Sequence, residues 1–207
     1  MVSTLKLTKI QIPNSDSDVI SLDATTGNIA FNKPVTGTAM VNLLDADIST
    51  VSQYDITSTY INSTYDEYIL SFNLLPASDN ASVYMRIRIA DAIQSGSIYA
   101  YEAQAIDGGA DTHSDAATQF RFNGSGIGNA SGEGISGRIH LHNINNANFP
   151  FNYTGGANHP NTSGTPISVV VGGSLIVANA ASIVNGITLF FNSGNIASGT
   201  VKLHGIN

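Results

Sequence analysis

The end of the chain, residues 185–207, constrains the fold most, because apolar and polar residues alternate there at every second position. The alternating apolar residues are Ile187, Leu189, Phe191, Val201 and Leu203. A period of two places successive side chains on opposite faces of a β-strand. Gly194 and Gly199 suit a tight turn and a bulge between two such strands. The stretch therefore predicts a closing β-hairpin whose second strand ends the chain inside a sheet.

The body of the chain repeats this design as short alternating segments between polar or glycine-rich turns. The predicted strands are 68–74, 83–89, 98–103, 117–122, 135–144 and 167–177, and the predicted turns are 76–80, 107–109, 123–126, 155–156 and 172–173. Segments 68–74 and 83–89 form the clearest antiparallel pair, and 178–183 alone has the composition of a helical turn. This pattern predicts an all-β fold, an antiparallel β-sandwich of the jelly-roll-like kind.

Residues 1–37 differ from the rest, because they hold three short strand-like fragments separated by polar breaks. Their apolar residues are Leu5, Leu7, Ile10, Ile12, Val19, Ile20, Leu22, Ile29 and Phe31. Such fragments are too short to bury a core alone. We divide the chain into 1–37, a short N-terminal β-arm for attachment and oligomerisation, and 38–207, the sandwich. Burying one large apolar side chain stabilises by about 1.5 to 3 kcal/mol, which favours a homotrimer joined through the arm; the arm folding back on its own sandwich is the competing account.

The amino-acid composition limits the kinds of partner that this protein can bind. Charged residues make up 11% of the chain, against about 25% in an average soluble domain, so Ser, Thr, Asn and Gly must cover the surface. The net charge is −7 and the basic residues are scattered, which argues against a nucleic-acid partner.

The sequence has no apolar run of about 20 residues and no signal-peptide core. We expect no membrane insertion and synthesis in a cytoplasm. The absence of Cys excludes disulfides and thiolate metal sites.

Two groups of residues raise the question of a bound metal. His140 and His142 lie at alternate positions of one predicted strand, and three copies could supply six nitrogens to an ion on a three-fold axis; two solvent-facing histidines are the simpler interpretation. Asp107, Asp111 and Asp115 stand four apart in a loop. That spacing does not match an EF-hand, so a solvated acidic loop is the simpler interpretation there. We assign no metal and no cofactor.

Catalytic motifs are missing from the sequence, which contains no G-x-S-x-G, H-E-x-x-H, P-loop or dinucleotide fingerprint. The carboxylates of Asp66, Glu67 and Glu102 could form a glycosidase pair only at a separation that sequence does not give. Turn or rim positions are the simpler interpretation for all three. We expect the protein not to be an enzyme and assign no catalytic residue.

A carbohydrate-binding module is the alternative function. It rests on aromatic residues expected at the surface, which are Tyr84, Phe149, Phe151 and Tyr153. Tyr84 precedes Arg86 and Arg88 in the alternation, so its ring could stack on a sugar whose hydroxyls an arginine holds. The missing signal peptide counts against this function.

Three segments of the chain resemble segments of a known protein family. They are the run SGNIASGT at 193–200, the strand STYDEYIL at 63–70 and the glycine-rich link at 126–137. Together they resemble a family of bacteriophage virion proteins of the tail-fibre or head-fibre type, over roughly residues 60–207. The run SLDATTGNIAF at 21–31 is similar to the stems of phage fibres. The resemblance implies a β-sandwich carried on a phage particle, usually as a homo-oligomer, and no catalytic residues.

We therefore expect a phage virion structural protein, made in the host bacterial cytoplasm and located in the virion. It would serve as a short fibre, a capsid decoration protein or a tail component, with a host-surface or particle-stabilising role. The arm would contact other virion proteins of the capsid or tail, and the sandwich would point outward, where a host-surface glycan is one candidate contact. A glycan-degrading enzyme is the least favoured function. Sequence does not decide between head and tail.

Overall fold

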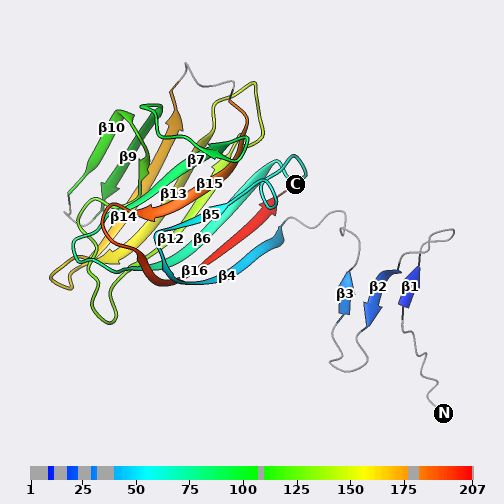
Figure 1. Cartoon of the computed structure of the whole chain (residues 1–207), viewed down its shortest axis with the longest axis horizontal. Coiled ribbons are helices and arrows are strands. Elements are labelled where there is room, and N and C mark those ends of the chain that lie inside the picture. Colours follow the sequence, from blue (N-terminus) through cyan, green and yellow to red (C-terminus); the bar gives the residue numbers. More distant parts are fainter. Residues whose placement is uncertain are drawn as a thin grey trace, which may run out of the picture. The chain divides into compact units, whose positions relative to one another are not determined.

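The computed structural model describes residues 9–11, 18–22, 29–31, 40–106, 110–176 and 182–206. The chain divides into two compact units, Met1–Thr38 and Ala39–Asn207 (Figure 1). The strands of the first unit are β1 (Lys9–Gln11), β2 (Asp18–Leu22) and β3 (Ile29–Phe31). Those of the second are β4 (Val41–Val51), β5 (Gln53–Ile56), β6 (Glu67–Pro76), β7 (Val83–Ile89), β8 (Ala92–Ile93), β9 (Tyr99–Ala105), β10 (Thr112–Ala117), β11 (Phe120–Arg121), β12 (Ile135–His142), β13 (Asn152–Pro160), β14 (Pro166–Leu175), β15 (Val184–Phe191) and β16 (Ile196–Ile206).

The first unit is a small antiparallel sheet in the order β1-β2-β3. Its register pairs Ile10 with Ile20 and Ile20 with Phe31. The predicted apolar positions 5, 7 and 12 lie outside the described residues.

The second unit consists of two antiparallel sheets packed against each other, and it confirms the predicted all-β, jelly-roll-like sandwich. The large sheet has eight strands in the order β10-β9-β14-β13-β12-β6-β16-β4. The small sheet has the order β11-β7-β15-β5, with β8 paired to β7. The chain passes repeatedly between the two layers (Figure 1). The described residues include no helix that could span a membrane.

The core lies between the sheets and is rich in aromatic rings. Phe120 of the small sheet packs edge-on against Tyr99 and Tyr153 of the large sheet, with ring centroids 4.7 Å away in both cases. The Tyr99 hydroxyl donates a hydrogen bond to the Gln94 carbonyl at 2.6 Å and accepts one from the Ile87 N–H at 3.2 Å. Burial raises the pKa of Tyr99 to about 12, so this side chain stays a neutral donor inside the sandwich.

Two predicted strand pairings are wrong. Segments 68–74 and 83–89 form β6 and β7, but β6 pairs with β12 and β16 in the large sheet while β7 pairs with β15 in the small one. The predicted pairing of the last two strands in a closing hairpin is also wrong. β15 pairs with β5 and β7 in the small sheet, whereas β16 pairs with β4 and β6 in the large sheet. Each connection crosses between layers. Alternation of apolar and polar residues shows only that one face of a strand is buried. Two strands that face each other from different sheets, about 10 Å apart, therefore show the same alternation as two hydrogen-bonded neighbours.

Two predicted turns are also wrong, because the glycine pairs 155–156 and 172–173 lie inside β13 and β14. Close packing explains one glycine of each pair. A Cβ on Gly155 would lie 2.2 Å from the carbonyl oxygen of Arg138, and a Cβ on Gly173 would lie 2.7 Å from the ring of Tyr153. Glycine in a strand interior marks such a close approach as well as a bulge. Of the predicted helical turn at 178–183, residues 178–181 lie outside the described ranges.

Candidate functional site

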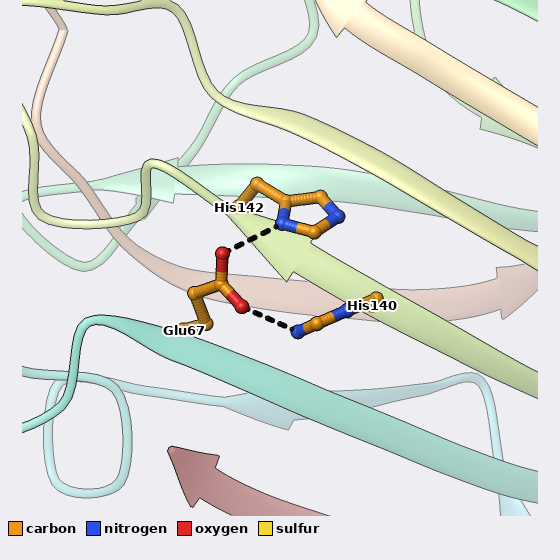
Figure 2. A group of neighbouring side chains, drawn as sticks. All are labelled: Glu67, His140 and His142. Carbon is orange, nitrogen blue, oxygen red and sulfur yellow. Dashed lines mark hydrogen bonds and ion pairs between the residues drawn. The ribbon is translucent and has the colours of Figure 1, made fainter. Parts of the chain in front are cut away.

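Neighbouring strands of the large sheet bring Glu67 to the histidine pair. In the register of β6 with β12, Ile69 lies opposite His140 and Tyr68 lies opposite Leu141. Glu67 is the next residue along β6, so it comes level with His142, and the three polar side chains share the outer face. Figure 2 shows the carboxylate between the two imidazole rings. We call Glu67, His140 and His142 the His–Glu cluster.

The polar atoms of the His–Glu cluster lie close together. Oε1 of Glu67 lies 3.0 Å from Nδ1 of His142, and Oε2 lies 2.8 Å from Nε2 of His140. The centroids of the two imidazole rings are 4.2 Å apart. Nε2 of His142 lies 3.3 Å from Oγ1 of Thr154, on β13. The exposed fractions of the side chains are 40% for Glu67, 35% for His140 and 25% for His142, so the cluster faces solvent on one side.

The two contacts of the carboxylate differ in kind. The hydrogen bond from His142 is the main cause that lowers the pKa of Glu67; desolvation opposes it and His140 supports it. Glu67 is therefore ionised at neutral pH. Nε2 of His140 is close to Oε2, yet it is a buried nitrogen that makes no hydrogen bond of acceptable geometry within the described part of the chain. We take the short contact as an ion pair, and it contributes to the lowered pKa of Glu67.

The cluster belongs to a row of side chains that crosses the whole large sheet. The register aligns, strand by strand, His113, Glu102, Gly172, Thr154, His140, Ile69, His204 and Asn42. Towards β10 this face carries a hollow of about 880 Å³, whose lining includes Glu102, His113, Asp115 and Gly172. Glu67 also lines a second hollow of about 310 Å³, together with Asp66 and Asn145 among others.

The predicted acidic group does not appear as a site. Oδ1 of Asp111 accepts a hydrogen bond from the N–H of Ala105 at 2.9 Å, which supports the connection between β9 and β10. Asp115 is exposed on β10, and Asp107 lies outside the described residues. Among the described residues, the His–Glu cluster is the one group of three or more His, Cys, Asp or Glu side chains whose ligand atoms converge, all within 4.8 Å.

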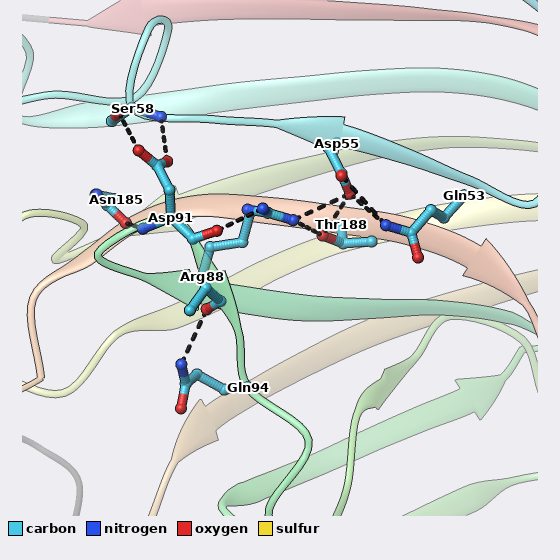
Figure 3. Close-up of polar contacts among 9 residues, drawn as sticks. Gln53, Asp55, Ser58, Arg88, Asp91, Gln94, Asn185 and Thr188 are labelled. Carbon is cyan, nitrogen blue, oxygen red and sulfur yellow. Dashed lines mark hydrogen bonds and ion pairs between the residues drawn. The ribbon is translucent and has the colours of Figure 1, made fainter.

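The arginines beside Tyr84 connect the strands of the small sheet. Arg88 contacts Oδ1 of Asp55 at 3.1 Å and Oγ1 of Thr188 at 3.0 Å (Figure 3). Cζ of Arg86 lies 4.9 Å from the centroid of the Phe190 ring, and the Tyr84 ring packs edge-on against the same ring at 5.6 Å. These groups already have partners within the chain.

The expectation of four exposed aromatic residues is wrong for two of them. Phe151 is fully buried and Tyr153 is 1% exposed, whereas Phe149 is 60% exposed. Phe151 and Tyr153 both contact Phe120 in the core. Their neighbours in sequence are Pro, Asn and Gly, which made the segment look like a loop, whereas it forms β13 in the interior of the large sheet.

The remaining histidines occupy different places. His159 is a buried residue of β13, with Nδ1 3.1 Å from the carbonyl oxygen of Pro160. His204 lies on β16, and β6 separates it from the strand of His140.

Comparisons with family models, curated proteins and solved structures find no match to this chain. The site must therefore be interpreted from its own geometry. Sequence reasoning identified the histidine pair and, separately, the carboxylate of Glu67, but did not join them. They are 73 residues apart at the nearest, from Glu67 to His140. Only the register of β6 with β12 brings them together.

Proposed function

We propose that the protein is a structural component of a bacteriophage virion, a short fibre, a capsid decoration protein or a tail component with a non-catalytic role. The observation that carries the proposal is the division of the chain into a small three-stranded unit and a large sandwich. A particle-borne module needs one part that attaches and one that is presented. The resemblance of segments 63–70, 126–137 and 193–200 to phage fibre proteins supports the same function.

The small unit is proposed to join three copies and to contact other virion proteins. Its register aligns Ile10, Ile20 and Phe31 across the sheet, and strands of three to five residues cannot enclose a core of their own. Copies related by a three-fold axis would cover the apolar residues of the arm and pair strand edges in a closed arrangement.

The outer face of the large sheet supports a position at the particle surface, exposed to water. One row of the register runs Asp47, Thr200, Asn73, Ser136, Asn158 and Ser168. Neighbours in this row bond to each other: Nδ2 of Asn73 donates to Oγ1 of Thr200 at 3.0 Å, and Oγ of Ser168 donates to Oδ1 of Asn158 at 2.7 Å. Short hydroxyl and amide groups make a hydrated surface of low charge.

Mass spectrometry of purified phage particles tests the proposal. The chain should be present in a fixed stoichiometric ratio to the major capsid protein and should stay with the particles through density-gradient purification. Absence of the chain from particles, with its presence in the lysate, would overturn the proposal.

A carbohydrate-binding function is the second candidate, favoured by the hollow of about 880 Å³ on the outer face. Polar side chains at its rim include Glu102, Gln104 and His113, and Gly172 leaves space where a larger residue would fill it. A glycan array probed with the intact chain tests this candidate. Binding that is lost on Glu102→Gln would support it, and no signal at high protein concentration would exclude it.

A further inference from the structure

We infer that Glu67, His140 and His142 bind one divalent transition-metal ion of the zinc class within a single chain. This inference is independent of the proposed function, because it rests on side chains that the virion proposal does not use. The donor set is two imidazole nitrogens and one carboxylate oxygen, Nδ1 of His142, Nε2 of His140 and Glu67. Imidazole suits zinc, nickel, cobalt and copper, whereas calcium and magnesium take mainly oxygen ligands.

The distances fit a shared ion. Zinc binds imidazole nitrogen at about 2.0–2.1 Å and carboxylate oxygen at about 2.0–2.2 Å, so two ligands of a tetrahedral ion lie roughly 3.3 Å apart. The Glu67 oxygens lie 3.0 Å from His142 and 2.8 Å from His140. The ligand atoms of all three residues lie within 4.8 Å of one another, so side-chain rotation can bring them around one ion. The outer side of the cluster is open, so water can complete the coordination.

A neighbouring strand supplies the support that metal-bound histidines usually have. When Nδ1 of His142 binds the ion, its Nε2 carries the proton and donates to Oγ1 of Thr154, which lies 3.3 Å away. A partner of this kind fixes the tautomer and the orientation of the ring. Thr154 lies directly opposite His140 in the register of β12 with β13, so three adjacent strands build the site.

A polar cluster without metal is the competing account, and the contact of His140 with Glu67 bears on the choice. Nε2 of His140 is buried and makes no hydrogen bond of acceptable geometry with the described residues, although Oε2 of Glu67 is only 2.8 Å away. A donor that served only to bind the carboxylate would point its N–H at the oxygen. The same two atoms also form an ion pair when His140 is protonated, so measured metal binding decides between the two accounts.

Isothermal titration of the EDTA-treated full chain with ZnCl₂ tests the inference, together with the visible absorption of the Co²⁺-loaded protein. One ion should bind per chain, and excess Mg²⁺ should not compete. Glu67→Gln, His140→Asn and His142→Asn should each weaken Zn²⁺ binding at least tenfold. Thr154→Val should weaken it about 10- to 100-fold, the usual effect of removing a supporting partner.

Two other histidines of the same row, exchanged as His113→Asn and His204→Asn, serve as matched controls and should leave the affinity unchanged. Circular dichroism of each metal-free variant establishes that it is folded. Absence of Zn²⁺ binding by the folded wild type, or unchanged affinity in the folded cluster variants, would overturn the inference. So would one ion per three chains that survives Glu67→Gln, since that result would assign the metal to histidines on a three-fold axis.

Discussion

Asp91 illustrates at the scale of one residue how a surface carboxylate joins two loops. It accepts hydrogen bonds from the N–H and Oγ of Ser58, at 2.9 Å and 2.6 Å (Figure 3). The hydrogen bonds from Ser58 lower the pKa of Asp91 below its ordinary 3.8. A carboxylate whose pKa is lower in the folded state stabilises the fold above the unfolded-state pKa, and this stabilisation is lost as the pH falls through the folded-state value.

Asp91→Asn should therefore destabilise the protein at neutral pH, by an amount that shrinks below about pH 3.8. Asn tolerates the left-handed backbone of this position, where φ is 60°, and keeps one acceptor, so the exchange removes mainly the charge. Urea unfolding of both proteins at pH 7 and pH 3 measures the difference. A difference in unfolding free energy that stays the same at the two pH values would contradict the assigned role.

The glycines of β14 provide a second test at this scale. A Cβ at Gly173 would meet the carbonyl oxygen of Ala100 and the ring of Tyr153, both at 2.7 Å, whereas a Cβ at Gly172 would meet nothing closer than 3.6 Å. Overpacking of a core typically costs about 1–3 kcal/mol. Gly173→Ala should lower the unfolding free energy by that amount, and Gly172→Ala should leave it unchanged or raise it slightly. Equal effects of the two exchanges would contradict the packing described here.

At the scale of strands, alternation predicted where strands form but not which strands pair. It located β6, β7, β12, β15 and β16 from apolar residues at every second position, because one face of each is buried. It missed β4 and β5, for which no strand was predicted. It also missed β13, where glycine and asparagine hide the pattern, and β10, which lies at a sheet edge with little burial. The candidate site follows the same logic. The spacing of His140 and His142 predicted a shared face, but Glu67 joins them through a register that no local pattern contains.

Engineered disulfides can test the strand pairing, since the chain has no native cysteine. Ser71 and Lys202 lie directly opposite each other on β6 and β16, so Ser71→Cys with Lys202→Cys should form a disulfide in the folded protein. Phe190 and Ser198 would pair in a β15–β16 hairpin but lie in different sheets. Phe190→Cys with Ser198→Cys should stay reduced, as mass spectrometry under non-reducing conditions would show. A disulfide between positions 190 and 198, with none between positions 71 and 202, would instead support the predicted β15–β16 hairpin.

For the whole molecule, the sandwich should fold without the first unit. Among the residues whose burial the structure describes, every apolar residue of the core cluster lies between Leu44 and Leu203, so a chain that lacks residues 1–37 keeps all of these. Circular dichroism and thermal unfolding should show a cooperative β-protein. An unfolded truncated chain would instead favour the account in which the arm folds back on its own sandwich.

The claim that the first unit joins three copies is the centre of the proposed architecture. Light scattering coupled to size-exclusion chromatography measures it directly on the intact chain at micromolar concentration. The account predicts a mass three times the 21.6 kDa of one chain, falling to the mass of a single chain when residues 1–37 are removed. A single-chain mass for the intact protein would contradict the trimer.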